Sequence, residues 1–289
     1  MKNGVDNFTK DLLNSVSASQ VSQNQWAPSW IGYLVPGIKF GLGLDAGVSS
    51  LSLKSIKQAA DEIGADDIKN ISMNHLPLPT MNLDLRVGGF ILPFDAGFTF
   101  MTLDTSRIGS LDSALSGFSF KYFAIGGDAR YAIIKNMLPD FKLSLTAGFY
   151  YSKFNIGFDD ENNDTIKAAD ISFKAMTFTT GAQASIKLAG FFVPYGGARF
   201  ILSRGDLNWS LTPNWKGLLD SGDADISNAV AYFLPKTLKG DVEGKWIFRP
   251  QTYFGFAFDL AVVEITNYVA YTFVSNVWNG NISFRFALD

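Results

Sequence analysis

The side chains that could carry out chemistry are few and stand far apart in the chain. His75 is the only histidine, and Ser72 lies just before it in the sequence. Nucleophilic catalysis needs a base within hydrogen-bond reach of the nucleophile and a third group that orients the base. No third group stands at a recognisable spacing. We therefore interpret His75 as a loop histidine without a role and expect that the protein is not an enzyme.

Two further motifs superficially resemble a metal site and a nucleotide site. Residues 159–164 are rich in oxygen ligands that suit Ca²⁺, but they lack the spacing and terminal glutamate of an EF-hand loop. Residues 41–47 carry three glycines, yet they lie within an alternating segment rather than at a strand-to-helix turn. The chain has no cysteine, which excludes disulfides and cysteine metal sites. We predict a solvated acidic loop, no metal and no cofactor.

The remaining chemically active groups are charges that recur inside alternating segments. Asp84 and Arg86, for example, stand between Leu83, Leu85 and Val87. Because successive strand side chains point to opposite faces, such a segment has one apolar face and one charged face. The charged residues on these polar faces are Lys39, Asp45, Asp84, Arg86, Asp95, Asp128, Arg130, Lys142, Lys187, Arg199, Asp259 and Arg285.

Segments of this kind recur about ten times, and their spacing predicts β-strands. Their apolar faces are bulky, often with phenylalanine, whereas their polar faces carry glycine, serine and charge. The phase slips near Phe123, where we predict a bulge. Residues 262–273 are apolar on both faces, and residues 212–246 show no clean period. The predicted strands cover approximately 37–48, 81–88, 94–100, 117–134, 141–149, 176–187, 192–202, 254–260, 262–273 and 278–288.

A membrane barrel explains these strands better than a soluble barrel or sandwich. The chain has no apolar run of about 18 residues that would predict a membrane-spanning helix, so only a closed barrel could span lipid. Phenylalanine at nearly every inward position would overpack a soluble barrel, and glycine weakens a water-facing strand. We predict an all-β protein, a closed antiparallel transmembrane β-barrel of about 10 strands (roughly 8–14) over residues 36–289.

The connections between the predicted strands alternate in length. Those at about 89–93, 135–140, 189–190 and 260–262 are short, and those at about 51–77, 105–116, 159–170 and 212–246 are long. Outer-membrane barrels have short periplasmic turns and longer outer loops. The first long connection also predicts a short helix from Ser55, Ile56, Ala59, Ala60 and Ile63. The net charge of −3, with 18% charged residues, argues against nucleic-acid binding.

If the barrel prediction holds, the twelve charges line its lumen, and two interpretations stay open. They form an ion-pair network across the barrel, or they form a charged constriction that selects solutes by its field. The opposite signs nearly cancel, which favours the network.

The N-terminal segment, residues 1–35, precedes the predicted barrel. Phe8, Leu12, Leu13 and Val16 fall on one side of an amphipathic helix predicted over residues 6–20. This segment is either a plug in the barrel mouth or a periplasmic tail. The N-terminus lacks the apolar core of a signal peptide, so we expect a mature chain whose secretory signal has been removed.

The pattern as a whole resembles outer-membrane β-barrel proteins of Gram-negative and spirochaete-like bacteria. Within them it loosely resembles the long-chain fatty-acid transporter group, through the N-terminal segment Phe8–Trp30, the glycine-alternating strand Gly37–Val48 and the aromatic last strand. Barrels of that group are larger, their Asn-Pro-Ala start motif is absent here, and this chain ends on Asp289 rather than on an aromatic residue. The resemblance implies an outer-membrane location, contact with membrane lipids, the barrel-assembly machinery and a hydrophobic small molecule as ligand.

The sequence thus predicts a passive channel or transporter for small or hydrophobic solutes, with a narrow polar lumen. The alternative is a non-transporting barrel whose surface loops bind partners, as an adhesin or structural protein does.

Overall fold

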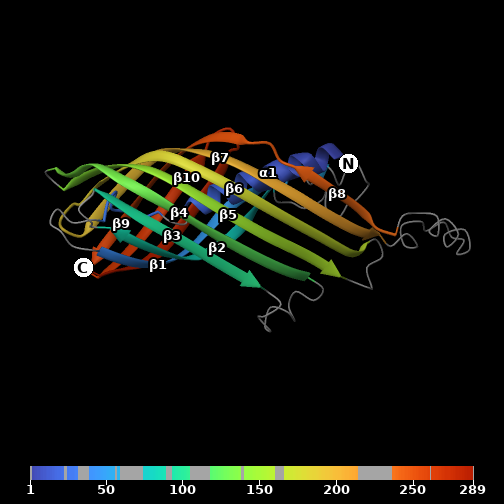
Figure 1. Cartoon of the computed structure of the whole chain (residues 1–289), viewed down its shortest axis with the longest axis horizontal. Helices are drawn as coiled ribbons and strands as arrows, with labels where there is room; N and C mark the ends of the chain where they lie inside the picture. The colour runs from blue at the N-terminus through green and yellow to red at the C-terminus, as the bar shows by residue number, and fades with distance from the viewer. Residues whose placement is uncertain are drawn as a thin grey trace, which may run out of the picture.

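The computed structural model describes residues 2–22, 25–31, 39–55, 57–58, 74–88, 93–104, 118–137, 140–159, 166–213, 236–260 and 262–288. Over these residues the chain forms one long helix, α1 (Lys2–Ser22), followed by strands (Figure 1). The strands are β1 (Lys39–Ser52), β2 (His75–Gly88), β3 (Phe94–Asp104), β4 (Phe118–Met137), β5 (Phe141–Asp159), β6 (Ile166–Ile186), β7 (Phe192–Pro213), β8 (Leu238–Glu243), β9 (Ile247–Leu260), β10 (Val263–Thr272) and β11 (Val277–Leu288).

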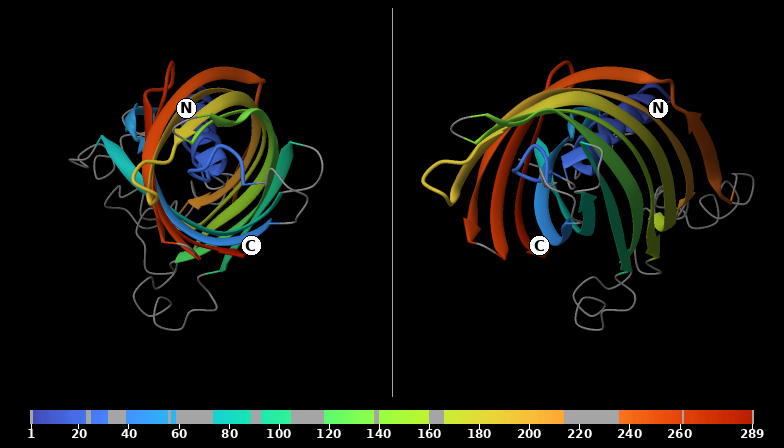
Figure 2. Two further views of the ribbon diagram at one scale, coloured as in Figure 1. Left: turned by 90° about the vertical axis from the view of Figure 1, so that its left-hand side faces the viewer. Right: turned by 60° about the vertical axis from the view of Figure 1, so that its left-hand side comes forward.

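Ten of these strands form a closed antiparallel ring. Each consecutive pair from β1 to β7 is hydrogen-bonded, β9 follows β7, and β10 and β11 lead back to β1. The ring closes where Leu42 of β1 faces Phe286 of β11. Viewed along its axis the sheet encloses a central space (Figure 2, left). The predicted fold class and strand count are therefore confirmed.

The remaining strand, β8, comes just before β9 in the chain and is separated from it by residues 244–246. Both strands pair with β7. β8 pairs with the far half of β7, where Leu207 faces Val242, whereas β9 pairs with the near half of the same strand. The sequence pattern missed this arrangement, because it placed the strand start near residue 254 and assigned no period to 212–246. Residues 214–235 of that long connection lie outside the described residues.

The bulky apolar residues point outward, as predicted. Phe98, Phe256 and Phe284 expose 47%, 39% and 51% of their surfaces, whereas Arg86 and Arg285 expose none. In a water-soluble protein this arrangement would place a continuous apolar surface in water. The barrel is instead inverted relative to a soluble one, with its charges enclosed and its aromatic rings outside.

Two strand-level predictions are wrong. The β4–β5 register runs without a shift past Phe123 and changes only between Ala132, Ile134 and Met137, so the bulge lies near the end of β4. The apparent slip at Phe123 arises because the inward face itself becomes apolar there, where Tyr122 packs against the cluster that includes Leu13 of α1. Strand β10 keeps its phase, with Glu264 and Thr266 buried inside.

The ends of the barrel differ, and we name them by their connections. The turns β2–β3, β4–β5, β6–β7 and β9–β10 mark the short-turn end, and the long connections mark the long-loop end. At one short turn, Ala189 and Gly190 have φ values of 50° and 79°, a conformation that glycine adopts readily. No described helix is both long and apolar enough to cross a membrane. Of the helix predicted in the first long connection, residues 54–55 and 57–58 are helical and 56 and 59–73 lie outside the described residues.

Candidate functional site

The helix α1 lies inside the barrel. From Leu12 to Ser22 nearly every residue is buried, whichever side of the helix it occupies. A helix that is buried all round is enclosed by its surroundings, and Figure 2 (left) shows α1 within the ring of strands. The helix predicted over residues 6–20 spans Lys2–Ser22 in the structure.

The described residues of the N-terminal segment, 2–22 and 25–31, run through the lumen from one end to the other. Near the long-loop end, the Ser55 hydroxyl donates to the Asp11 carboxylate at 2.6 Å. Midway, the amide of Asn281 donates to the Ser22 carbonyl at 3.0 Å. At the short-turn end, the Ile31 backbone amide donates to Asp95 at 3.0 Å. The segment therefore begins at the long-loop end and joins the barrel wall at the opposite end (Figure 1).

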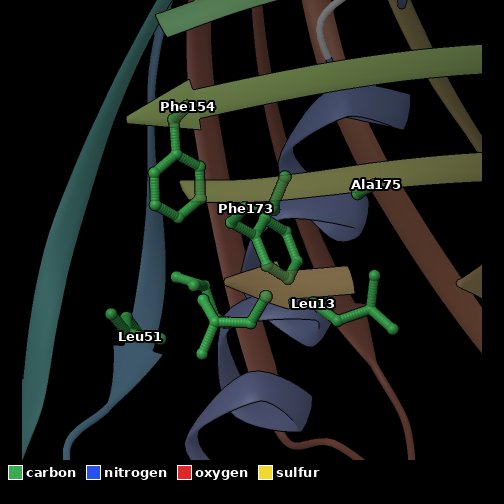
Figure 3. Packing of buried hydrophobic residues seen from close by; sticks show 8 residues of the cluster. Leu13, Leu51, Phe154, Phe173 and Ala175 are labelled. Carbon is green, nitrogen blue, oxygen red and sulfur yellow. The ribbon is translucent and has the colours of Figure 1, made fainter. Parts of the chain in front are cut away.

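Apolar contacts hold the first half of this segment. Leu12, Leu13 and Val16 pack in one cluster with side chains from several strands (Figure 3). Their wall partners are Leu51, Phe154, Phe173, Ala175 and Leu207. Phe8 is partly buried against the same cluster. Burying an aliphatic side chain of this size contributes about 1.5–3 kcal/mol, so this cluster favours the occupied lumen.

Polar groups dominate the other faces of the helix, and several of them are satisfied in one of two ways. Ser17 and Ser22 bond back to the helix, at 2.6 Å to the Leu13 carbonyl and 2.7 Å to the Ala18 carbonyl. Other groups reach the wall: the Ser15 hydroxyl donates to the Ser50 carbonyl at 2.8 Å. Such bonds allow a serine-rich helix to be buried in a polar lumen.

Trp26 is the main anchor of the second half of the segment. Its Nε1 atom donates to the Asp84 carboxylate at 2.7 Å, and its ring lies against β1. A Cβ atom added to Gly41 would come within 2.0 Å of this ring, and one added to Gly43 within 2.3 Å of Asp84. The glycine alternation of β1 thus leaves the space that the indole and the carboxylate occupy.

One ion-pair network surrounds Arg285. Its guanidinium lies 2.8 Å from Asp45, 3.4 Å from Asp84 and 3.8 Å from Glu264. It also stacks over the Trp26 ring, 4.9 Å from the centroid. The guanidinium and its three carboxylate partners come from four different strands, so the network ties the wall together and fixes the plug against it.

A second network lies closer to the short-turn end. Arg86 bonds to Asp95 and, at 2.7 Å, to Asp128. Arg130 lies 2.8 Å from Asp95 and donates to the Pro28 carbonyl of the N-terminal segment at 2.7 Å. Here again, wall charges neutralise one another and also bind the segment.

The other predicted lumen charges form a vestibule at the short-turn end. Lys39, Lys142 and Lys187 line a cavity of about 200 Å³ together with Asp259 and the segment residue Trp30. Lys187 lies 2.6 Å from Asp259. The predicted lumen residues thus all lie inside the barrel, but they belong to two networks and a vestibule, with Arg199 apart from them.

Sequence reasoning missed several lumen residues. Arg249 and Glu264 are buried at 1% and 5% exposure, but they stand in stretches where no clear alternation was recognised. Gln183 donates to the carbonyls of Trp26 and Ala27 at 2.7 and 3.1 Å. Its position between Ala182 and Ala184 puts it on the polar face of its strand, yet nothing in the sequence links an amide there to the N-terminal segment.

The other candidate motifs do not gather into a site. His75 begins β2 opposite Ser52 rather than lying in a loop, and it is exposed; Ser72 lies outside the described residues. Of the acidic run, only Asp159 is described. Over the described ranges, no three His, Asp or Glu side chains are arranged to hold a metal ion.

Similarity to known proteins is limited to solved structures. No family model and no curated protein matches the chain. Among solved structures it is similar to the outer membrane protease OmpT from Escherichia coli, with 10% identity over 89% of this chain and 99% of that chain and a TM-score of 0.43. It is also similar to the translocator domain of the autotransporter NalP from Neisseria meningitidis, with 9% identity over 99% of this chain and 96% of that chain and a TM-score of 0.39. A third similar structure is the P. putida toluene transporter TodX, with 10% identity over 88% of this chain and 69% of that chain and a TM-score of 0.39.

These proteins have different activities, so the likeness assigns none to this chain. The closer resemblance to long-chain fatty-acid transporters is not confirmed. The architecture itself is that of outer-membrane β-barrels: a closed antiparallel ring with an even number of strands, one set of short turns, an apolar exterior and a polar lumen.

Proposed function

We propose that this barrel lies in a bacterial outer membrane and lets small solutes cross passively when its N-terminal segment leaves the lumen. The observation that carries the proposal is the segment itself, which occupies the lumen and is joined to its wall by hydrogen bonds as well as by apolar contacts. With the described part of the segment in the lumen, we interpret the channel as closed.

The polarity of the contact surface supports a movable segment. The bonds that Asp84, Arg130 and Gln183 make to it are ones that water can replace at little net loss. An apolar lumen would instead be left unfavourably exposed when the segment departs. The apolar clusters that contain Leu13, Val21 and Ala27 oppose release in this way, so the closed state is favoured without being permanent.

The exterior and the turns support the location and orientation. An apolar belt of aromatic and aliphatic side chains is the surface that lipid requires. Short turns of such barrels face the periplasm. On that basis, α1 begins near the cell exterior, and the vestibule around Lys142 opens toward the periplasm.

A reversible cross-link tests whether movement of the segment is the gate. The Ser49 hydroxyl donates to the Ser15 carbonyl at 3.1 Å, and the chain has no cysteine of its own. We expect the oxidised Ser15→Cys/Ser49→Cys variant to pass no current in planar bilayers, even in urea that leaves the barrel folded. Reduction should restore the openings of the unmodified chain under the same conditions.

The two single-cysteine variants are the controls, because each keeps one substitution without the cross-link. Equal current in the oxidised and reduced double variant would contradict a gate formed by the segment.

A second candidate function is suggested by the long strands. β4, β5, β6 and β7 have 20, 19, 21 and 22 residues, whereas about 9–11 span a bilayer. Their ends therefore project beyond the membrane at the long-loop end. There, Ile171, Asn208, Trp209 and Asp241 contribute to an open groove that supports binding of a surface partner. A barrel that stays sealed without its N-terminal segment would favour this function.

A further inference from the structure

The buried arginines of the lumen differ in whether a carboxylate lies close enough to form an ion pair. Arg86, Arg130 and Arg285 each lie within 4.0 Å of at least one carboxylate. Arg199 and Arg249 have none within that distance in the described part of the chain. Both are nonetheless buried, at 7% and 1% exposure. A buried cation without a counter-charge is costly unless strong hydrogen bonds compensate.

Neutral oxygen atoms supply these bonds, and several belong to the N-terminal segment. Arg249 donates to the side-chain oxygens of Asn14 in α1 and Ser203 in the wall. Its Nε atom has no hydrogen-bond partner among the described residues. The site around this guanidinium is therefore incompletely satisfied even with the segment in place.

Arg199 shows the same dependence on the segment. Its Nη1 atom donates to the Val21 carbonyl at 2.6 Å and to the Gln25 side chain at 3.1 Å. Its Nε atom donates to Gln251 of the wall at 2.6 Å. The guanidinium also lies over the Tyr253 ring, 4.8 Å from the centroid. Departure of the segment would thus remove two of its acceptors and leave the aromatic platform.

The two arginines belong to one surface of the wall. In the register of β7 and β9, Arg199 faces Gln251 and Ile201 faces Arg249. The arginines therefore lie on adjacent strands at diagonal positions, because Arg249 is two residues before the cross-strand partner of Arg199. Both side chains are directed into the lumen. Side chains at such diagonal positions are about 7–8 Å apart at their backbones, a spacing at which two long side chains can share one ligand.

We propose that Arg199 and Arg249 form a binding site for anionic solutes bearing carboxylate or phosphate groups, and that such anions compete with the N-terminal segment for it. Guanidinium groups bind these oxyanions through paired, charge-assisted hydrogen bonds. An anion supplies the counter-charge that the segment's neutral oxygens lack, so it favours the released segment. This inference rests on the proposed gating function and names the class of solute that the gate admits.

The test measures release of the segment in the full chain, independently of any current. Thr177 lies under the helix, and its hydroxyl donates to Gln20 at 3.2 Å. In a Thr177→Cys chain, the introduced thiol is the only one. We expect a water-soluble maleimide to label it several-fold faster in inorganic phosphate than in chloride of equal ionic strength.

Two variants in this background decide whether the arginines are responsible. Arg199→Gln/Arg249→Gln should lower the phosphate-to-chloride rate ratio to about one, because side-chain amides lack the charge that holds the anion. Arg204→Gln is the matched control, since Arg204 lies on β7 but is half-exposed and paired with Asp206 at 3.5 Å; it should keep the full ratio.

A ratio of one in the Thr177→Cys chain, an unchanged ratio in the double variant, or no labelling in either salt would overturn the anion site. Failure of the proposed gate is seen separately, in current measurements. A channel that conducts while its labelling ignores phosphate would keep the gate and reject the anion site.

Discussion

Deletion of residues 2–31 is expected to convert a barrel that is silent at moderate voltage into an open channel. The described part of this segment occupies the lumen over its whole length, from the Asp11 contact to the Asp95 contact. The remaining wall keeps buried groups such as Ser152, Thr177 and Gln183, which water would solvate. Discrete current steps in planar bilayers, absent from the full chain, are the expected result.

A second variant guards against misfolding of the shortened chain. Replacing Leu12, Leu13 and Val16 with serine keeps the full length but removes the apolar contacts that these three residues of α1 make with the wall. It should raise the frequency of openings in the full chain. Silence of both variants, with β-sheet content and heat-resistant migration intact, would contradict a gated channel and favour the surface-binding function.

Replacement of Arg285 with methionine is expected to cause the largest loss of stability of any single lumen substitution. Asp45, Asp84 and Glu264 would remain buried without the guanidinium that lies among them. Removing one partner from a buried ion pair costs about 3–5 kcal/mol. Urea unfolding in lipid vesicles, followed by tryptophan fluorescence, measures the change in the free energy of unfolding.

The matched control replaces an arginine whose ion pairs are exposed. Arg204 lies 3.5 Å from Asp206 and 3.8 Å from Glu243, and an exposed pair contributes about 0–1 kcal/mol. Arg204→Met should therefore have little effect on unfolding. A similarly small effect of Arg285→Met would show that water, rather than the guanidinium, stabilises the three carboxylates.

The strands and their two faces were predictable because alternation is a local property. For Leu83, Asp84 and Leu85, alternation with the neighbouring residues is enough to predict which face of the strand each side chain occupies. The inversion could also be inferred, since phenylalanine at so many positions would not fit inside a barrel of this size. Closure followed from the need to satisfy every backbone group in lipid.

The pairing inside the lumen could not be predicted, because it depends on contacts between distant residues. Arg285 meets Glu264 and Asp45 only after the ring closes through β1 and β11. The direction of the N-terminal segment depends in the same way on its contacts at both ends. Nothing in the sequence indicates Asp84 as the partner of Trp26.

Quenching of single tryptophans tests the inverted, plugged barrel most directly. Trp26 is buried in the lumen at 1% exposure, whereas Trp278 points outward at 56%. In chains that retain only one of them, the others being phenylalanine, brominated lipid should quench Trp278 strongly and Trp26 hardly at all. Aqueous iodide should also leave Trp26 unquenched. Strong quenching of Trp26 by iodide would place the segment outside the barrel, and a Trp278 insensitive to brominated lipid would contradict the lipid-facing exterior.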